Sequence, residues 1–291
     1  MTEASKKVEM WFTERQTPHL AISLRVKETL ARETTPYQEL AIMETYEFGT
    51  LLTLDGIVQT TVKDEFIYHE QMTHVPLHTH PEPKTVLVIG GGDGGIVREA
   101  LKHPSVEKVV LVDIDERVIE ACKKHLPTIS CALDDPRVEV RIEDGIKFVK
   151  KARNAFDVII IDSTDPVGPA VGLFTADFYR SALEALTEEG VVVAQTESPL
   201  LNPDMVKRVF ETFAGIFPIA RVYTAEVPTY PGAIWAITLG SKVHDPMDLP
   251  AERFRDIETR FYTPWVHMRS FALPRFVEEL VQEQRPRFGV R

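Results

Sequence analysis

A glycine-rich segment with one acidic residue inside it is the first part of the sequence that could carry chemistry. The apolar run Val86–Ile89 leads directly into Gly90-Gly-Gly-Asp-Gly-Gly95, which is typical of a buried parallel strand that turns into a helix. The spacing of Gly90, Gly92 and Gly95 matches the dinucleotide fingerprint, whose glycines let a ligand approach the backbone. Because glycine-rich turns are common, the meaning of this spacing depends on the residues around it.

Carboxylates follow the other predicted strands of the same region. Ligands of an open parallel sheet bind outside the carboxyl ends of its strands, so the residues at these ends are candidates for a site. They are Asp113 and Asp115, then Glu143, Asp144 and Gly145, then Asp162 and Asp165, then Gln195 and Glu197. Capping of the next helix explains one or two acidic residues here, such as Asp115 and Asp177, but not a series of strand ends. We therefore predict a functional site at this edge of the sheet.

Asp113 and Asp93 indicate the kind of ligand. Asp113 lies roughly 20 residues past the glycine segment, where a carboxylate can accept both hydroxyls of a ribose, so we expect a ligand that contains adenosine. Asp93 places a negative charge at a helix start, where a dinucleotide would put its pyrophosphate. Unless it is only a helix cap, it repels phosphate and attracts a cation. The two residues favour a sulfonium nucleoside or an amine over a nicotinamide dinucleotide.

Two carboxylates three residues apart form the second candidate site. Asp162 and Asp165 leave a buried strand and lead into Pro166–Leu173, which could form a loop over the site. Two like charges in a crevice raise each other's pKa unless a cation joins them. The pair therefore suits an ammonium group of a substrate, with one carboxylate accepting its proton. Turn formation by Asp and Pro is the other explanation, and both can hold.

Aromatic residues and histidines offer further contacts. Pro228-Thr-Tyr-Pro-Gly232 and Trp235 place rings beside a tight turn, where they either pack in the core or contact an amine through cation–π interaction. Several histidines gather towards the end of a predicted helix: His69, His74, His78 and His80. They lack the tight spacing of a metal site, so we expect packed or solvated histidines and no metal.

The elements that must position these residues fall into two parts. Alternating apolar residues and the turn signals Phe48-Gly49 and Asp55-Gly56 predict antiparallel hairpins, which are followed by a helix over 64–78. From Lys84 onward strands alternate with helices, which predicts an α/β fold with a mostly parallel, doubly wound sheet. A sixth strand followed by a late hairpin favours a Rossmann-like sheet of the methyltransferase type, and a last helix is expected over 274–282.

We divide the chain near residue 80, where Pro81-Glu-Pro83 interrupts the pattern. Residues 1–80 are expected to form a small N-terminal antiparallel β domain plus a linking helix. Residues 81–291 are expected to form the Rossmann-like catalytic domain.

The composition narrows the class of protein. The 291 residues carry 33 basic and 44 acidic side chains, a net charge of −11, which disfavours nucleic acid and anionic membranes as partners. No apolar run approaches the length of a membrane span, and no apolar signal core follows the first lysines. We expect a cytoplasmic protein.

Three motifs together resemble the polyamine aminopropyltransferase family: the segment 90–95, Asp162-Ser-Thr-Asp-Pro-Val-Gly-Pro169, and Pro228-Thr-Tyr-Pro-Gly232. Leu54–Gln59 and Asp64–Glu70 are similar to the N-terminal domain of that family. The resemblance implies transfer of an aminopropyl group from the co-substrate decarboxylated S-adenosylmethionine to putrescine, giving spermidine and 5′-methylthioadenosine. It also implies a homodimer or homotetramer that needs no metal or prosthetic group.

The resemblance also implies roles for single residues. Asp162 matches the proton acceptor, and Asp165 its partner in gripping the diamine. Asp93 matches the residue that holds the aminopropyl ammonium of the donor. The implied catalytic residues are Asp162, Asp165 and Tyr68. The implied donor-binding residues are Gln38, Gly90, Gly92, Asp93, Asp113 for the ribose, Asp144 and Gly145 for the adenine, and Pro169. The implied substrate-binding residues are His69, Asp93, Asp162, Asp165, Gln195 and Tyr230, to which we add Trp235.

The chemistry of a primary amine agrees with these roles. Such an amine is mostly protonated at neutral pH and so is not nucleophilic. Asp162 would take the proton, and the neutral nitrogen would attack the carbon next to the sulfonium in one displacement. Agmatine, cadaverine or spermidine could replace putrescine as acceptor. An S-adenosylmethionine-dependent N-methyltransferase and a non-catalytic nucleoside- or polyamine-binding protein remain as other hypotheses.

Overall fold

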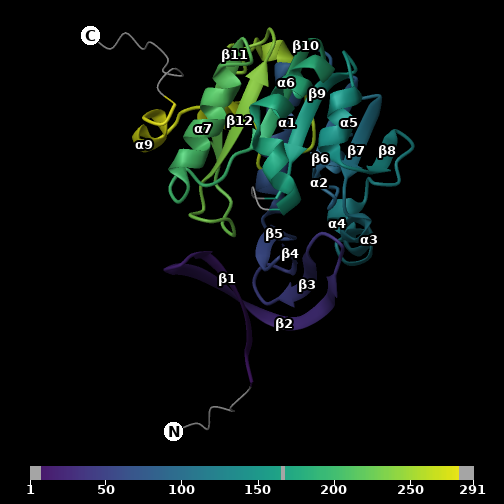
Figure 1. The fold of residues 1–291 in the computed structure, drawn as a ribbon, viewed down its shortest axis with the longest axis vertical. Coiled ribbons are helices and arrows are strands. Elements are labelled where there is room, and N and C mark those ends of the chain that lie inside the picture. Colours follow the sequence, from purple (N-terminus) through teal and green to yellow (C-terminus); the bar gives the residue numbers. More distant parts are fainter. Residues whose placement is uncertain (1–7, 165–167, 282–291) are drawn as a thin grey trace.

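The computed structural model describes residues 8–164 and 168–281, which form two β-sheets with helices packed on the larger one (Figure 1). The smaller sheet is antiparallel and its strands follow chain order: β1 (Met10–Thr17), β2 (Leu20–Thr34), β3 (Glu39–Thr45), β4 (Thr50–Leu54) and β5 (Ile57–Thr61). Asp55 and Gly56, between β4 and β5, both have positive φ (51° and 76°), as a two-residue hairpin turn requires. The small antiparallel unit predicted from the turn signals is confirmed.

The larger sheet has seven strands in the order β11-β12-β10-β9-β6-β7-β8. Their bounds are β6 (Thr85–Gly90), β7 (Lys108–Asp113), β8 (Val138–Ile142), β9 (Phe156–Asp162), β10 (Leu186–Gln195), β11 (Ile219–Ala225) and β12 (Trp235–Ser241). β12 runs antiparallel to both its neighbours, whereas the strands from β10 to β8 pair in parallel. This order, with a late antiparallel hairpin, confirms the predicted Rossmann-like sheet of the methyltransferase type.

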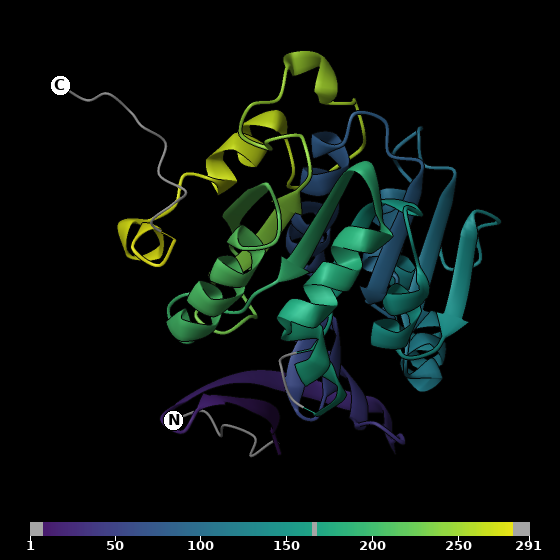
Figure 2. The same ribbon diagram turned by 45° about the horizontal axis from the view of Figure 1, so that its top comes forward.

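Helices cover both faces of the larger sheet because its central strands are apolar on both sides. In β6, Val86 and Val88 pack into one hydrophobic core, and Leu87 and Ile89 into the other. The first face carries α1 (Glu65–Thr79), α2 (Gly95–Ala100) and α8 (Pro264–Ser270), and the second carries α5 (Gly145–Lys151), α6 (Ala176–Ala185) and α7 (Pro203–Ala214). Figure 2 shows α6 and α7 in front of the sheet.

Two helices after β7 join the larger sheet to the smaller one. They are α3 (Glu116–His125) and α4 (Pro127–Ser130). They bury apolar side chains against β3 and β4 in a separate cluster, which contains Leu40, Ile42, Leu52, Leu54, Val118, Cys122, Leu126 and Ile129. The small sheet is therefore fixed next to the loops that follow the parallel strands.

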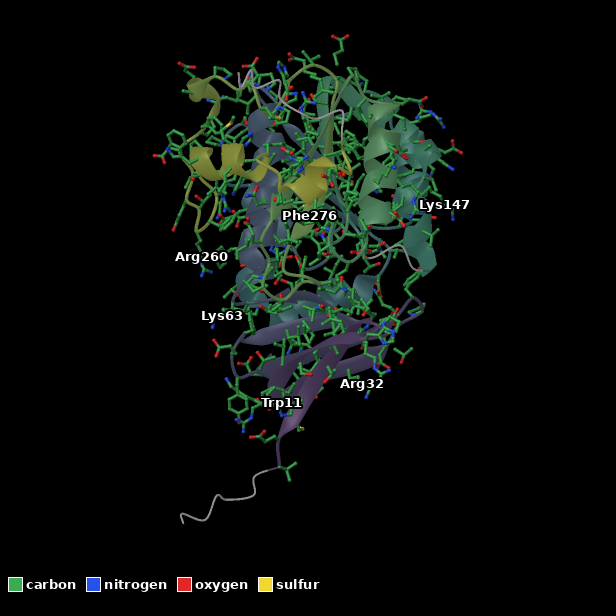
Figure 3. All side chains as sticks on the ribbon, turned by 90° about the vertical axis from the view of Figure 1, so that its left-hand side faces the viewer. Trp11, Arg32, Lys63, Lys147, Arg260 and Phe276 are labelled. Carbon is green, nitrogen blue, oxygen red and sulfur yellow. The ribbon has the colours of Figure 1, made fainter. Side chains whose placement is uncertain are left out.

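Helix α1 is buried on nearly every side, although many of its residues are polar. Every residue in it except Phe66 and Ile67 is buried. The carboxylate of Glu70 accepts hydrogen bonds of 2.7–2.8 Å from the backbone N–H groups of residues 260–262. The side chain of Arg260, which is labelled in Figure 3, lies over the Phe66 ring. The domain boundary near residue 80 stays a prediction, and α1, which precedes it, packs on the larger sheet.

The C-terminal helix is shorter than the sequence predicted. α9 spans Arg275–Glu278, residues 279–281 continue as a turn, and residue 282 lies outside the described part. Two short 3₁₀ helices complete the list, η1 (Gly168–Phe174) and η2 (Ala251–Arg253). Within residues 8–164 and 168–281, no helix has both the length and the apolar character needed to cross a membrane.

Candidate functional site

A pocket opens at the carboxyl ends of the parallel strands, where the chain order of the sheet reverses between β6 and β9. The predicted site residues that line it are Gln38, Tyr68, His69, Gly90, Gly92, Asp93, Asp113, Asp144, Gly145, Asp162, Gln195, Tyr230 and Trp235. Asp165 lies outside the described residues, and Pro169 is placed in η1 without a described side chain. The fold thus gathers the predicted residues around one cavity, while their individual roles stay predictions.

The glycines of the segment 90–95 are needed because other parts of the chain approach them closely. Gly90 has a φ of +75°, and a Cβ there would lie 2.1 Å from the backbone oxygen of Asp162. A Cβ on Gly95 would lie 2.2 Å from the His69 ring. Gly90 is needed for its left-handed backbone and its close contact, and Gly95 for its close contact alone. The segment therefore brings the end of β9 against Gly90 and α1 against the start of α2.

Asp162 lies at the end of β9, opposite Gly90 in the sheet register. The Tyr68 hydroxyl donates a hydrogen bond of 2.6 Å to its Oδ1. Burial, together with the charge of Asp93, raises the pKa of Asp162 to about 7, against the opposing effects of His69 and the Tyr68 hydrogen bond. A carboxyl with such a pKa can both hold and release a proton near neutral pH.

Asp93 makes contacts with both of its oxygens. Oδ1 accepts a 2.7 Å hydrogen bond from the N–H of Gly95, and Oδ2 lies 3.3 Å from Nε2 of His69. It therefore accepts a backbone hydrogen bond at the start of α2 and also lines the pocket, while its role towards a ligand stays a prediction. Burial acts to lower the pKa of His69, but the charges and hydrogen bonds of Asp93 and Glu65 raise it well above its usual value.

The acidic residues at the other strand ends line the pocket, cap the next helix, or do both. Burial raises the pKa of Asp113 to about 6, although the backbone N–H groups of Asp115 and Gly92 oppose this. Asp144 accepts from the N–H groups of residues 146 and 147 and so caps α5. Asp115 caps α3 as expected and also accepts a 2.9 Å hydrogen bond from the Gln38 amide.

Two expectations about acidic residues are corrected by the structure. Thr175, not Asp177, caps α6, because its hydroxyl accepts from the N–H of Phe178. Glu143 and Glu197 follow their strands but are not among the pocket-lining residues. The acidic wall of the pocket is therefore narrower than the sequence pattern suggested.

Three aromatic side chains form another wall. The Tyr230 ring lies 5.3 Å from the Tyr68 ring and 5.0 Å from the Trp235 ring, and its hydroxyl donates to the Gln59 backbone oxygen at 2.7 Å. Nearby, the Gln195 amide donates to the Ser163 backbone oxygen at 3.0 Å. Tyr230 and Trp235 thus combine core packing with exposure to the pocket, an arrangement suited to the carbon chain of an amine.

Sequence reasoning missed two contributions to the site. Asp55, Ile57 and Gln59 of the β4–β5 hairpin line the pocket. The sequence indicates only that this segment is similar to the N-terminal domain of the family. Glu65 lies behind His69, with its Oε2 2.5 Å from the His69 Nδ1. Its position four residues before His69 on one helix is the signal that could have found it.

The remaining histidines lie away from the pocket. His74 and His78 are buried, with the His74 Nδ1 3.0 Å from Nε2 of His103. His80 approaches Asp157 at 3.8 Å. In the part of the chain that the structure describes, no His, Cys, Asp or Glu residues are grouped as a metal site would need.

Two family models match the chain. Residues 65–248 match the spermine/spermidine synthase domain, and residues 10–62 match the spermidine synthase tetramerisation domain. The chain is also 58% identical over 272 residues to a polyamine aminopropyltransferase of Desulforudis audaxviator (strain MP104C), which covers 94% of this chain and 99% of that relative. These matches confirm the resemblance inferred from the three motifs.

Solved structures agree with the sequence comparison. A crystal structure of a spermidine synthase in complex with the transition state analogue AdoDATO is similar with a TM-score of 0.92 and 43% identity, covering 94% of this chain and 95% of that one. The spermidine synthase from Thermotoga maritima is similar with a TM-score of 0.91 and 42% identity, covering 97% and 98%.

We expect Asp162→Asn to stabilise the fold much more at high pH than at low pH. Because the folded-state pKa of Asp162 is about 7, the folded protein binds a proton that the unfolded chain lacks between about pH 4 and pH 7, so the wild-type free energy of unfolding falls as pH rises through this window. Urea unfolding should give a gain on the order of 1–3 kcal/mol near pH 8 and about a quarter of that gain or less near pH 4.5.

The matched control for this prediction is Asp256→Asn, the same substitution at an exposed position. It should change the free energy of unfolding little at either pH. A gain for Asp162→Asn that is the same at both pH values would contradict the raised pKa.

Proposed function

The chain belongs to the spermine/spermidine synthase family, and on this basis we propose that it acts as a spermidine synthase. It transfers the aminopropyl group of decarboxylated S-adenosylmethionine to putrescine, which gives spermidine and 5′-methylthioadenosine. The observation that carries this proposal is that Asp93 and Asp162 line one pocket beside the glycine segment. Such a pocket attracts ammonium groups and disfavours phosphate.

The donor nucleoside is held at the ends of β7 and β8. Asp113 lies against Gly92, where a Cβ would come within 2.7 Å of its Oδ2, and its carboxylate accepts the ribose hydroxyls. Asp144, Gly145 and Gln38 surround the adenine side. Asp93 then receives the aminopropyl ammonium. Ordinary S-adenosylmethionine carries a carboxylate on that arm, which Asp93 and Asp162 repel.

The transfer is a single displacement that needs a free amine. The acceptor ammonium gives a proton to ionised Asp162, whose oxygen Oδ1 is fixed by Tyr68. The nitrogen lone pair forms a bond to the carbon attached to sulfur, and the carbon–sulfur bond breaks. Its electron pair stays on sulfur, so the sulfonium becomes a neutral thioether. Positioning of the two substrates supplies much of the rate gain.

The acceptor lies along the aromatic wall formed by Tyr68, Tyr230 and Trp235. We assign its far ammonium group to Gln195, while the near nitrogen faces Asp162, with which Asp165 grips the diamine as the resemblance implies. Putrescine carries a primary amine at each end of a short carbon chain. Cadaverine, agmatine and spermidine are the alternative acceptors, because they share a primary amine and differ in length.

A panel of acceptors with either donor tests this function. We expect wild-type protein with decarboxylated S-adenosylmethionine to convert putrescine into spermidine faster than it uses cadaverine, agmatine or spermidine, as measured by mass spectrometry. With S-adenosylmethionine as donor we expect no methylated amine. Methylated putrescine would support an N-methyltransferase instead, and failure to release methylthioadenosine with any amine would support a binding protein.

The same panel with Asp162→Asn serves as the control for the chemistry. We expect turnover to fall by at least about 100-fold, the range for loss of a general base, while the donor still binds. Turnover near the wild-type value would exclude Asp162 as the proton acceptor.

We expect Asp93→Asn to weaken the decarboxylated donor by roughly 10- to 100-fold and methylthioadenosine by much less. The reason is that methylthioadenosine lacks the ammonium, so it loses no charge-assisted hydrogen bond. Isothermal titration calorimetry measures both affinities. Asp113→Asn is the matched control, because the ribose is common to both ligands and their affinities should fall together. Equal losses in Asp93→Asn would remove the proposed ammonium contact.

We also propose that the protein is a homotetramer, with a homodimer as the alternative. Residues 10–62 match a tetramerisation domain, and the small sheet exposes Trp11, labelled in Figure 3, and Leu20. Light scattering of the full chain should give a mass near four times 32.9 kDa, or near twice that value for a dimer. The mass of a single chain would contradict the proposal.

A further inference from the structure

His69 lies between two carboxylates in the wall of the pocket. Its Nδ1 is 2.5 Å from Oε2 of Glu65, and its Nε2 is 3.3 Å from Oδ2 of Asp93. The ring is only 1% exposed, so water cannot replace either partner. An ionised carboxylate only accepts hydrogen bonds, and a neutral imidazole has a single N–H. Both contacts are therefore satisfied only when His69 is an imidazolium.

Glu65 is held in its ionised form from behind. Arg98 donates to the same Oε2 at 2.8 Å. Burial acts to raise the pKa of Glu65, but His69 and Arg98 outweigh it and lower the pKa to about 2. Glu65 is not among the pocket-lining residues. It can therefore act on a ligand only through His69.

The proposed donor ammonium meets a carboxylate that already has a cation beside it. One oxygen of Asp93 is bound to the Gly95 N–H and the other faces the imidazolium. Two cations next to one buried carboxylate repel each other. The repulsion ends if His69 loses the proton on Nε2, and the bare Nε2 can then accept a hydrogen bond from the ammonium.

We propose that Glu65 is a positioning residue for the amine site. It keeps a proton on Nδ1 of His69 by accepting the hydrogen bond from that N–H. The Nε2 proton therefore faces Asp93 in the empty pocket and is released when an ammonium ligand binds. The balance is one ammonium bound and one proton released to solvent. The identity of the ligand rests on the proposed function. The protonated histidine thus takes the place of the substrate cation until the substrate binds.

Other ionisable groups lie around His69, and their contribution to proton release must be distinguished from that of His69. They are Tyr68 on its own helix, Asp93 before α2, Asp162 at the end of β9, and Arg98 of α2, which bonds the same oxygen of Glu65. Asp162 is the important competitor, because a ligand ammonium can also drive a proton from its carboxyl group. The experiment is therefore made in an Asp162→Asn background, which removes that proton.

Calorimetric titration in two buffers of different ionisation enthalpy counts the released protons. Near neutral pH we expect about one proton released for each decarboxylated S-adenosylmethionine bound and almost none for methylthioadenosine, which lacks the ammonium. Donor affinity should rise up to about tenfold per pH unit while His69 stays charged in the empty protein. With Glu65→Gln we expect less than about half a proton and a flatter pH dependence.

Glu99→Gln is the matched control for the positioning role. Glu99 is buried like Glu65 and also bonds Arg98, although it is less exposed (1% against 7%), and it contacts His74 rather than His69. We expect it to leave the proton count unchanged. Two outcomes would overturn the proposal. One is an equal proton count for the two ligands in the Asp162→Asn background. The other is a count that does not change with Glu65→Gln, in a variant that still binds methylthioadenosine.

A spectroscopic measurement covers the case in which Glu65→Gln does not fold. The Cε1–H signal of His69 in the wild type is assigned from its absence in His69→Gln. We expect the charged form near neutral pH in the empty protein and the neutral form after the donor binds. A neutral His69 in the empty protein at neutral pH would overturn the proposal. Failure of the donor to bind would contradict the proposed function, whereas binding without proton release contradicts only this inference.

Discussion

The close approach of the glycine segment to Asp162 is the constraint on which the rest of the site depends. The N–H of Gly91 donates to the Asp162 backbone oxygen at 3.0 Å, and Gly90 has no Cβ to prevent this contact. The loops after β6 and β9, which follow neighbouring strands but are distant in sequence, are therefore joined at the point where the strand order reverses. Asp93 and Asp162 come to share one wall for this reason.

The second consequence of this approach is electrostatic. Carboxylates brought together away from water destabilise the fold unless their charge is compensated. The protein does this in three ways: Asp162 and Asp113 have raised pKa values, Asp144 accepts hydrogen bonds from backbone N–H groups, and Asp93 faces His69. A bound diamine or sulfonium would compensate the same charge, so the features that make the empty pocket costly also favour a cationic ligand.

The sequence predicted the positions of the strand-end residues well, because that part of the fold is determined locally. Each parallel strand is a short apolar run, and whatever follows it must lie at one edge of the sheet. Asp93, Asp113 and Asp162 could be placed on this basis alone. The type of sheet, by contrast, was inferred from a late hairpin pattern and from analogy, and the strand order was not predicted, since pairing between β6 and β9 leaves no local mark in the sequence.

The parts that could not be predicted depend on contacts between distant segments. Nothing near Asp55 or Gln59 indicates that the β4–β5 hairpin lines a pocket, because α3 and α4 place it there through an apolar cluster. The spacing of Glu65 and His69 could have indicated their contact, but the ion pair of Glu65 with Arg98 depends on the packing of α1 against α2. The expected cap at Asp177 was wrong because α6 already begins at Ala176, so Thr175 is its N-cap residue and its hydroxyl accepts from the N–H of Phe178.

The position of the β4–β5 hairpin has a consequence for how such a protein can change. The hairpin belongs to residues 10–62, the part matched by the tetramerisation domain, and it also contributes Asp55, Ile57 and Gln59 to the pocket. A substitution in this hairpin can therefore alter the pocket although it lies outside the sheet that carries the strand-end carboxylates. If this part of the chain also carries an oligomer contact, ligand binding and assembly would be linked through a few residues of one turn.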